Sequence, residues 1–288
     1  MITTELKLRI VETIKERLPF YGSANKMSVA LGINNAQLSR VMKGEIENVV
    51  SDANWISIAR KLDVQLHKEA VWVTAKTPVY MFIHTQLETC QKYSLSGLLC
   101  DIADIGKTHT AKEYVRTSKH AIYIDCSQVK SKQKLIRQIA KELGLGHTAK
   151  YNDVYGDLVF YLRSIPTPLI ILDEAGDLDF PAFLELKAMW NATEGCCGWF
   201  MIGADGLKTK IESNLAHKKV GYAEIFSRYG SVYQKITPDG KEALNEFVYT
   251  QIALISSANN ETDVKTMIAK TNGSLRRLKS TILKPKTI

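Results

Sequence analysis

Short apolar runs separated by amphipathic stretches are the feature that most constrains the fold of this 288-residue chain. The runs are SGLLCD (96–101), AIYIDC (121–126), PLIILD (168–173) and GWFMIG (198–203). Strands of a parallel sheet are covered on both faces, so they read as nearly continuous apolar runs. The stretches 131–144 and 180–192 between them have helical periodicity. This alternation predicts a doubly wound α/β domain with a parallel sheet.

The chain on either side of this region reads as helices only. Near the N-terminus, Leu6, Ile10 and Ile14 recur at helical spacing. The segment VWVTAKTPVY, with its valines, threonines and a proline, is typical of a linker between domains. We therefore expect an all-α N-terminal domain over 1–70, an α/β domain over 71–236 and a C-terminal helical subdomain over 237–288.

Composition excludes several classes of protein. Hydrophobic residues make up 45% of the chain and charged residues 24%, as in ordinary globular proteins. The sequence contains no apolar run of about 18 residues, so we expect no membrane span. Its N-terminus lacks the apolar stretch of a signal peptide, so we expect a cytoplasmic protein. The five cysteines show no paired spacing and predict buried free thiols.

The stretch LLCDIADIGKTHT carries the main chemical motif. Gly106-Lys107-Thr108 follows the first apolar run and opens a helical stretch, as in a phosphate-binding P-loop. Backbone amides at such a helix start face phosphates, the lysine neutralises β- and γ-phosphate charge, and the threonine hydroxyl binds Mg²⁺. The glycine that should begin the pattern is replaced by Asp101. A coincidental GKT at the start of a helix is the alternative to this interpretation.

A second motif reduces the weight of that alternative. PLIILDEAGDL delivers Asp173 and Glu174 at the end of an apolar run, which is where an α/β sheet builds its ligand sites. Asp173 suits the Mg²⁺ shell, and Glu174 suits a base that orients and deprotonates the attacking water. The two motifs in this order predict a P-loop NTPase that uses ATP and Mg²⁺, with Thr108 and Asp173 at the metal.

These residues also carry a family resemblance. From the helix-turn-helix pattern through LLCDIADIGKTHTAKEYVRT, ILDEAGDL, FMIGADGL, IFSRYG and NGSLRRL, the chain resembles the AAA+ ATPases of DNA transposition. The resemblance implies that Arg228 is an arginine finger reaching the nucleotide of a neighbouring subunit. It also implies that Arg276 approaches the γ-phosphate from the helical lid, a role that suits a planar cation. The expected nucleotide contacts are Gly106, Lys107, Thr108, His109, Asp173 and Arg276, and the expected catalytic residues are Glu174 and Arg228.

The chain departs from the family pattern at three positions. Asp101 and Asp104 stand where the family has glycines, and carboxylates beside a triphosphate are repulsive by about 1 kcal/mol each. Ala204 stands near the expected polar sensor of the γ-phosphate, and Asp205 is its nearest polar neighbour. We therefore expect weak nucleotide binding or slow hydrolysis.

The segment SANKMSVALGINNAQLSRVMKG has the layout of a helix-turn-helix. Gly32 supplies the turn, and Asn34 can cap a second helix over 35–42. Amide and basic side chains on that helix suit contacts with phosphates and base edges. The DNA-contact candidates here are Gln37, Arg40 and Lys43. A helical domain that docks another protein without binding DNA is the alternative.

Basic residues outside this helix suggest a second surface for DNA. The formal net charge is +8, which suits a polyanionic partner. If the protein coats double-stranded DNA through its phosphates, loops of the α/β domain should supply the contacts. The candidates are Lys130, Lys132, Lys134, Lys208 and Lys210. For each lysine, an ordinary solvated position is the alternative.

Three functions follow from these observations. The first is an ATP-dependent DNA-binding protein of transposition, which assembles as a filament or ring on target DNA, presents it to a transposase and dissociates after hydrolysis. The second is a helix-turn-helix regulator whose degenerate ATPase domain serves only for oligomerisation, which the aspartates of the phosphate loop favour. The third is a loader of a replicative helicase, because such loaders share the AAA+ parts.

Overall fold

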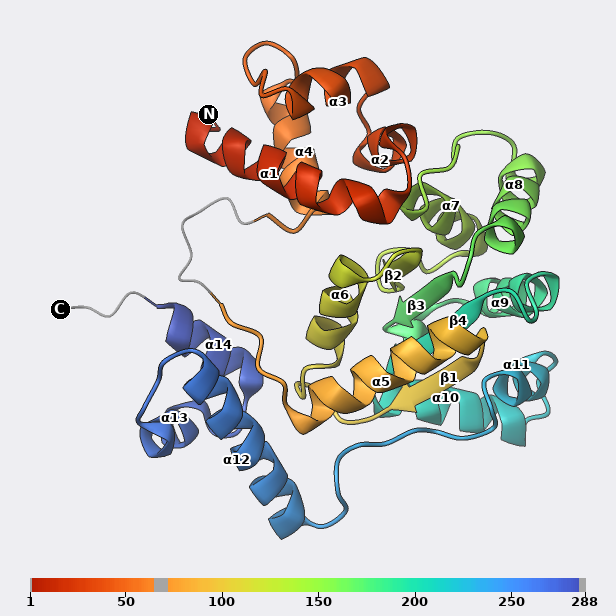
Figure 1. Ribbon diagram of the computed structural model, residues 1–288. Helices are drawn as coiled ribbons and strands as arrows, with labels where there is room; N and C mark the ends of the chain where they lie inside the picture. Colours follow the sequence, from red (N-terminus) through yellow and green to blue (C-terminus); the bar gives the residue numbers. More distant parts are fainter. Residues whose placement is uncertain (1, 65–71, 285–288) are drawn as a thin grey trace.

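A parallel sheet forms the centre of the molecule (Figure 1). The computed structural model describes residues 2–64 and 72–284. The strands are β1 (Ser96–Cys100), β2 (Ala121–Asp125), β3 (Leu169–Asp173) and β4 (Gly198–Gly203), in the order β1-β4-β3-β2. Every pairing is parallel. The parallel α/β sheet predicted from the apolar runs is confirmed, because β3 and β4 are buried along their whole length.

Helices cover both faces of the sheet, and alternate residues of each strand face opposite layers. Leu99, Ile171 and Phe200 pack on one side with α5 (Pro78–Tyr93) and α6 (Lys107–Thr117). Leu98, Leu172 and Met201 pack on the other side with the remaining helices of this region. Those helices are α7 (Lys132–Glu142), α8 (Tyr151–Ser164), α9 (Phe180–Ala192), α10 (Asp205–Ala216) and α11 (Tyr222–Arg228). This arrangement presents the carboxyl ends of the strands, with the segments that follow β1 and β3, at one side of the sheet.

The two outer strands have different surroundings. The free side of β1 is covered by the segment after α11, because the amide of Gln234 donates to the carbonyl of Leu98 at 2.8 Å. The amide of Cys100 returns a bond to the carbonyl of Gln234 at 3.1 Å. Within the described ranges, β2 pairs with β3 alone and has no strand on its other side.

The N-terminal helices have a hydrophobic core of their own, with Trp55 and Leu38 fully buried. They are α1 (Thr4–Tyr21), α2 (Ala24–Leu31), α3 (Asn35–Met42) and α4 (Asp52–Lys61). Helix α3 has the bounds predicted for the second helix, and Gly32 ends α2 in the left-handed region at φ 75°. Asn34 caps α3 by accepting from the amide of Gln37 at 2.7 Å.

The C-terminal helices form a smaller cluster beside the sheet (Figure 1). They are α12 (Lys241–Ala258), α13 (Val264–Thr271) and α14 (Leu275–Leu283), with Ile252 and Leu278 at the centre of their core. Trp72 and Ala75, from the segment before α5, pack against the same core. The expected domain limit at 70/71 lies outside the described residues.

The cysteines have no disulfide partner. Cys90, Cys100, Cys126 and Cys197 are buried, and Cys196 is half-buried. Burial raises the pKa of the Cys90 thiol to about 12, because a low-polarity environment disfavours the thiolate. The four buried cysteines are core side chains rather than reactive groups.

Candidate nucleotide site

The loop between β1 and α6 ends in a helix start that suits phosphate. Gly106 precedes α6 with φ 100°, a left-handed conformation that favours glycine. No side chain caps α6, so no cap competes for its first amides. A Cβ built on Gly106 would meet no atom within 4 Å, so the space beside it is open. An uncapped helix N-terminus beside open space is the arrangement that binds phosphate in P-loop proteins.

Lys107 lies across this loop. Its ammonium group donates to the carbonyls of Asp101 and Ile102, both at 2.6 Å. Burial lowers the pKa of Lys107, and the carboxylates of Asp101 and Asp173 oppose that shift. Because both partners are backbone carbonyls of the loop itself, the side chain can exchange them for phosphate oxygens.

Thr108 and Asp173 meet at the ends of α6 and β3. The Thr108 hydroxyl donates to Asp173 Oδ2 at 2.6 Å, although the two residues are 65 positions apart in the sequence. Asp173 is 2% exposed, and its Oδ1 accepts from the amide of Glu174 at 3.0 Å. A hydroxyl and a buried carboxylate side by side are the hard oxygen donors that Mg²⁺ prefers. The donor set therefore fits the metal that the motifs imply.

Tyr123 was not anticipated at this site. It comes from the middle of β2, and its hydroxyl donates to Asp173 Oδ2 at 2.8 Å. Burial and the nearby Asp173 charge raise the Tyr123 pKa. The only sequence signal was a polar atom inside the run AIYIDC, a run that otherwise predicts nothing beyond a buried strand.

Glu174 projects where β3 ends. It adopts φ 50°, a left-handed conformation that is strained for a residue with a side chain, and it is exposed. Local burial and the charge of Asp173 raise the pKa of Glu174. A carboxylate with a raised pKa is a better proton acceptor, which suits the predicted base.

Asp101 does not face the phosphate position. The carboxylate is 1% exposed and accepts from the amides of Ile236 and Thr237 at 2.7 and 2.9 Å. It also accepts from the Thr237 hydroxyl and from the amide of Ile102 at 2.8 Å. These donors fix the carboxylate against the segment that leads to α12, but they are neutral and its charge still acts on Lys107, so the expected repulsion of a triphosphate stays a prediction.

Asp104 is likewise directed away from the loop, toward α14. Its carboxylate accepts from the Ser274 hydroxyl at 2.6 Å and from the amide of Arg276 at 3.0 Å. The Arg276 guanidinium lies 3.7 Å from the same carboxylate, with 81% of its side chain exposed. The predicted lid arginine thus comes to the phosphate loop, but it pairs there with an aspartate.

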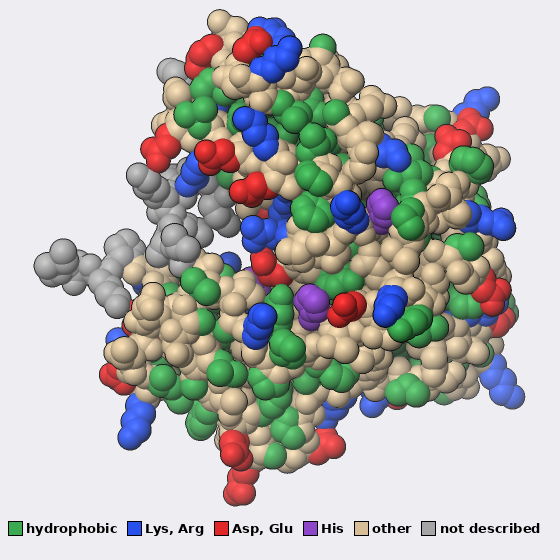
Figure 2. All heavy atoms as spheres, viewed as in Figure 1, with side chains coloured by type: hydrophobic (Ala, Val, Ile, Leu, Met, Phe, Trp, Pro, Cys, Tyr) green, Lys and Arg blue, Asp and Glu red, His purple; other side chains and the backbone are tan. Residues whose placement is uncertain are grey.

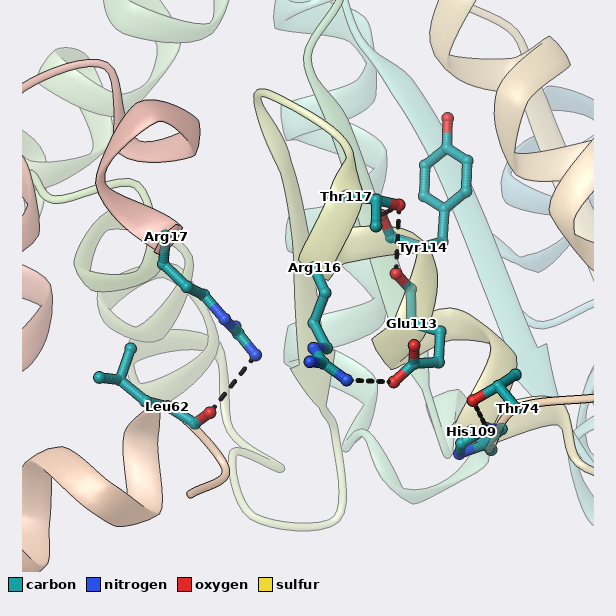
Figure 3. Close-up of polar contacts among 8 residues, drawn as sticks. All are labelled: Arg17, Leu62, Thr74, His109, Glu113, Tyr114, Arg116 and Thr117. Carbon is teal, nitrogen blue, oxygen red and sulfur yellow. Dashed lines mark hydrogen bonds and ion pairs between the residues drawn. The ribbon is translucent and has the colours of Figure 1, made fainter. Parts of the chain in front are cut away.

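Two other predicted positions lie close to the loop. His109 Nε2 lies 3.0 Å from the Thr74 hydroxyl, so the side chain turns toward the segment before α5 (Figure 3). Burial lowers the His109 pKa, which favours the neutral ring. Ala204 follows β4 and precedes α10 without a side-chain cap, and Asp205 after it is exposed.

Arg228 makes contacts only within its own neighbourhood. Its Nε donates to Asn191 Oδ1 at 2.8 Å, and its guanidinium lies 5.3 Å from the Trp190 ring centre. Helix α11 lies apart from α6 in Figure 1. The structure therefore does not bring Arg228 to the phosphate loop of its own chain, and the arginine-finger role stays a prediction about a neighbouring subunit.

The DNA candidates on α3 have different surroundings. The Gln37 amide donates to the carbonyl of Val49 at 3.0 Å and accepts from the amide of Asn34 at 3.1 Å. Gln37 is half-buried and engaged in capping α3, so its side-chain amide is less free for DNA than the sequence suggested. Arg40 is exposed and pairs with Glu45 at 2.7 Å. Lys43 is exposed as well.

The lysine candidates of the α/β domain differ in what their ammonium groups contact. Lys130 pairs with Asp177 at 3.3 Å, Lys132 with Glu185 at 2.8 Å and Lys208 with Glu212 at 3.9 Å. Lys134 is exposed and has no ion pair among the described residues. Lys210 is half-buried and donates to the carbonyls of Gly176 and Leu178. Its ammonium group is engaged inside the chain, and its role as a DNA contact stays a prediction.

Residues 2–64 and 72–284 contain neither a membrane-spanning helix nor a cluster of protein metal ligands. No helix there is long and apolar enough to cross a membrane. In the same residues, no group of three or more His, Cys, Asp or Glu side chains could by itself hold a metal ion. A metal at Thr108 and Asp173 would therefore need further oxygen ligands, as Mg²⁺ at phosphates ordinarily has.

Comparisons with known proteins agree with this geometry. Residues 90–211 match the family described as "AAA domain". The Mu-like prophage FluMu DNA transposition protein B of Haemophilus influenzae is 23% identical over 206 residues, which cover 68% of this chain and 69% of the relative.

Solved structures give weaker likenesses. The Orc1 protein of Aeropyrum pernix in complex with DNA has a TM-score of 0.46 at 13% identity, over 73% of this chain and 65% of that one. Cdc6p from Pyrobaculum aerophilum has a TM-score of 0.44 at 13% identity, over 72% and 67%. The chain thus spans less than two thirds of the Orc1 chain. Residues 90–211, which hold the parallel sheet and the loop before α6, are similar to the AAA domain family, and the chain resembles the Mu-like transposition protein B.

Proposed function

We propose that the protein binds ATP with Mg²⁺ at the loop before α6 and hydrolyses it slowly. One observation carries this proposal: the Thr108 hydroxyl meets the buried Asp173 carboxylate at 2.6 Å, beside the uncapped start of α6. Amides for phosphate and oxygen donors for a divalent cation thereby converge on one place.

Each side chain has a distinct task in this proposal. Lys107 leaves the carbonyls of Asp101 and Ile102 and neutralises the terminal phosphates. Thr108 and Asp173 hold the cation, which when bound neutralises charge developing on the phosphate oxygens. Glu174 accepts the proton of the attacking water, and its raised pKa makes it a stronger base.

We also propose that the ATP-bound protein assembles on double-stranded DNA and delivers it to a transposase. The name of the relative from Haemophilus influenzae supports DNA transposition as the process. The assembly would be a helical filament or a ring, with Arg228 of one subunit reaching the nucleotide of the next. The division at 70/71 and 236/237 belongs to this proposal, with helices α2 and α3 as a helix-turn-helix.

Sedimentation with and without duplex DNA tests the assembly. ATP and Mg²⁺ should move the protein into DNA-bound particles, and ADP should not. Lys107→Ala should abolish that shift, because the ammonium group that neutralises the phosphates is lost. Unchanged ATP affinity in this variant would contradict the assignment of the site.

A second function has one observation in its favour. Asp104 pairs with Arg276, so the lid arginine is occupied by a carboxylate at the position where a phosphate would attract it. This suits a helix-turn-helix regulator whose ATPase domain only oligomerises. DNA-stimulated ATP hydrolysis supports the first function, whereas sequence-specific DNA binding that is indifferent to ATP supports the second.

A further inference from the structure

A cleft of about 1080 Å³ separates the N-terminal helices from the α/β domain (Figure 2). One wall comes from α1 and α4. The other comes from α6, α7 and the free side of β2, with Lys279 of α14 at its margin. The lining contains eight lysines and arginines and six aspartates and glutamates. None of the DNA candidates from the sequence lines this cleft.

Cations face one another across it. Arg17, Arg60 and Lys61 line the N-terminal wall, and Lys112 and Lys141 line the opposite wall. Within residues 2–64 and 72–284, none of these five has a carboxylate within 4 Å. Arg17 donates only to the carbonyl of Leu62 at 3.3 Å, and its guanidinium points across the cleft toward α6 (Figure 3). Arg116 of α6 pairs with Glu113 of the same helix at 2.7 Å.

The two walls are held together at an electrostatic cost. Burial lowers the pKa of Arg17; Tyr21 and the carboxylates of Asp63 and Glu113 oppose this shift, and the charge of Arg116 adds to it. Burial lowers the pKa of Lys61 to about 8; the charges of Lys141 and Arg60 add to that shift, and the charge of Glu142 opposes it. Half-buried cations that repel one another are stabilised by an anion placed between them.

The carboxylates of the cleft offset this charge only in part. Glu113 is engaged by Arg116, and Asp125 accepts from the hydroxyl of Ser127 at 2.6 Å. Burial raises the pKa of Glu142, which disfavours its charged form. The other three carboxylates of the lining are Glu12, Glu16 and Asp63. The balance remains positive, with the cations on both walls.

We propose that this cleft binds the phosphate backbone of a nucleic-acid strand, which bridges the N-terminal helices and α6. The inference rests on the proposed DNA-binding function and names a site for it. Arginine and lysine on two facing walls match a chain of phosphates, because each phosphate can contact both sides.

The test uses the full chain with ATP and Mg²⁺. The variant Arg17→Gln/Lys112→Gln removes one cation from each wall. The control Lys15→Gln/Lys119→Gln makes the same charge change at exposed positions outside the lining. Random-sequence oligonucleotides, duplex and single-stranded, are titrated at several salt concentrations. The slope of log affinity against log salt should shrink by about 1.8 for duplex and about 1.4 for single strands in the cleft variant.

The control should keep the slope of the parent protein. An unchanged slope in the cleft variant, beside a parent that binds DNA, would overturn the cleft proposal and leave the proposed function intact. A parent that binds no nucleic acid in any nucleotide state would overturn both.

A second readout needs no variant. In the parent protein, the oligonucleotide should protect Lys112 from acetylation while Lys15 stays reactive, as measured by mass spectrometry. Protection of Lys112 by polyglutamate but not by oligonucleotides would mean that the cleft binds an acidic peptide, and the proposal would be wrong.

Discussion

Replacing Asp101 by glycine restores the usual first residue of the P-loop pattern, and we expect it to destabilise the protein. Glycine at this position would ordinarily favour phosphate binding. Here the Asp101 carboxylate is 1% exposed and accepts from Ile102, from Ile236 and twice from Thr237. Asp101→Gly would leave those buried donors without their acceptor and would release the segment before α12.

The magnitude follows from the number and type of bonds. The two bonds from Thr237 are buried, and hydrogen bonds to a charged group each contribute about 1.5–3 kcal/mol, whereas water can replace the acceptor of the part-buried amides of Ile102 and Ile236. We therefore expect the free energy of unfolding to fall by about 3–6 kcal/mol. For a chain of this size, that corresponds to a melting temperature lower by roughly 6–24 °C.

Thermal unfolding followed by circular dichroism measures the change, and Asp104→Gly is the matched control. Asp104 adopts φ 65°, where glycine is favoured, so the backbone gain offsets part of the bonds lost to Ser274 and Arg276. The control should keep its melting temperature within about 3 °C, on the scale of 1 kcal/mol or less. It should bind ATP more tightly, because Arg276 is freed. A melting temperature for Asp101→Gly as close to the parent as that of the control would refute this reasoning.

Three further predictions concern single side chains. Lys107→Ala should lower ATP affinity by at least tenfold, about 1.4 kcal/mol, in a fluorescent-nucleotide titration; parental affinity would contradict its role. Glu174→Gln should keep ATP binding and DNA-bound assembly but slow phosphate release by about 100-fold or more, because the amide cannot accept a proton; turnover at the parent rate would exclude it as the base. The pKa of Lys61 is about 8 in the folded protein against an ordinary 10.5, so the unfolded chain binds more protons between these values. The stability of the parent in urea, relative to that of Lys61→Met, should therefore rise as pH increases from 8 toward 10.5, and in this comparison the opposing contribution of buried thiols such as Cys90 cancels; a difference between the two proteins that stays flat over this window would show that the ammonium is not desolvated.

The sheet could be predicted from the sequence because each buried parallel strand is a short run of apolar residues. Buried strands such as 169–173 and 198–203 are almost wholly apolar, so their type and position can be read directly. The bounds of helix α3 could also be predicted, because Asn34 caps its start and Gly32 ends the helix before it. The meeting of Thr108 and Asp173 followed from strand ends that share one side of the sheet.

What the sequence could not predict depends on partners far along the chain. The sequence shows that Asp101 and Asp104 lie in the phosphate loop, but not what their carboxylates bind. The hydroxyls that donate to them belong to Thr237 and Ser274, which lie 136 and 170 positions further along the chain. Lys210 resembles any surface lysine, because the carbonyls that bind it leave no mark in the sequence. The Tyr123 hydroxyl is concealed inside an apolar run for the same reason.

The free side of β2 has a consequence for any shortened form of the protein. Residues 121–125 line the cleft, and the N-terminal helices stand across it. Deleting residues 1–71 would uncover a largely apolar strand whose outward edge pairs with no strand among the residues that the structure describes. Such a strand is a template for another copy of itself. The truncated protein should therefore self-associate with or without ATP, and particles formed that way would reflect aggregation through strand pairing rather than a nucleotide-driven filament.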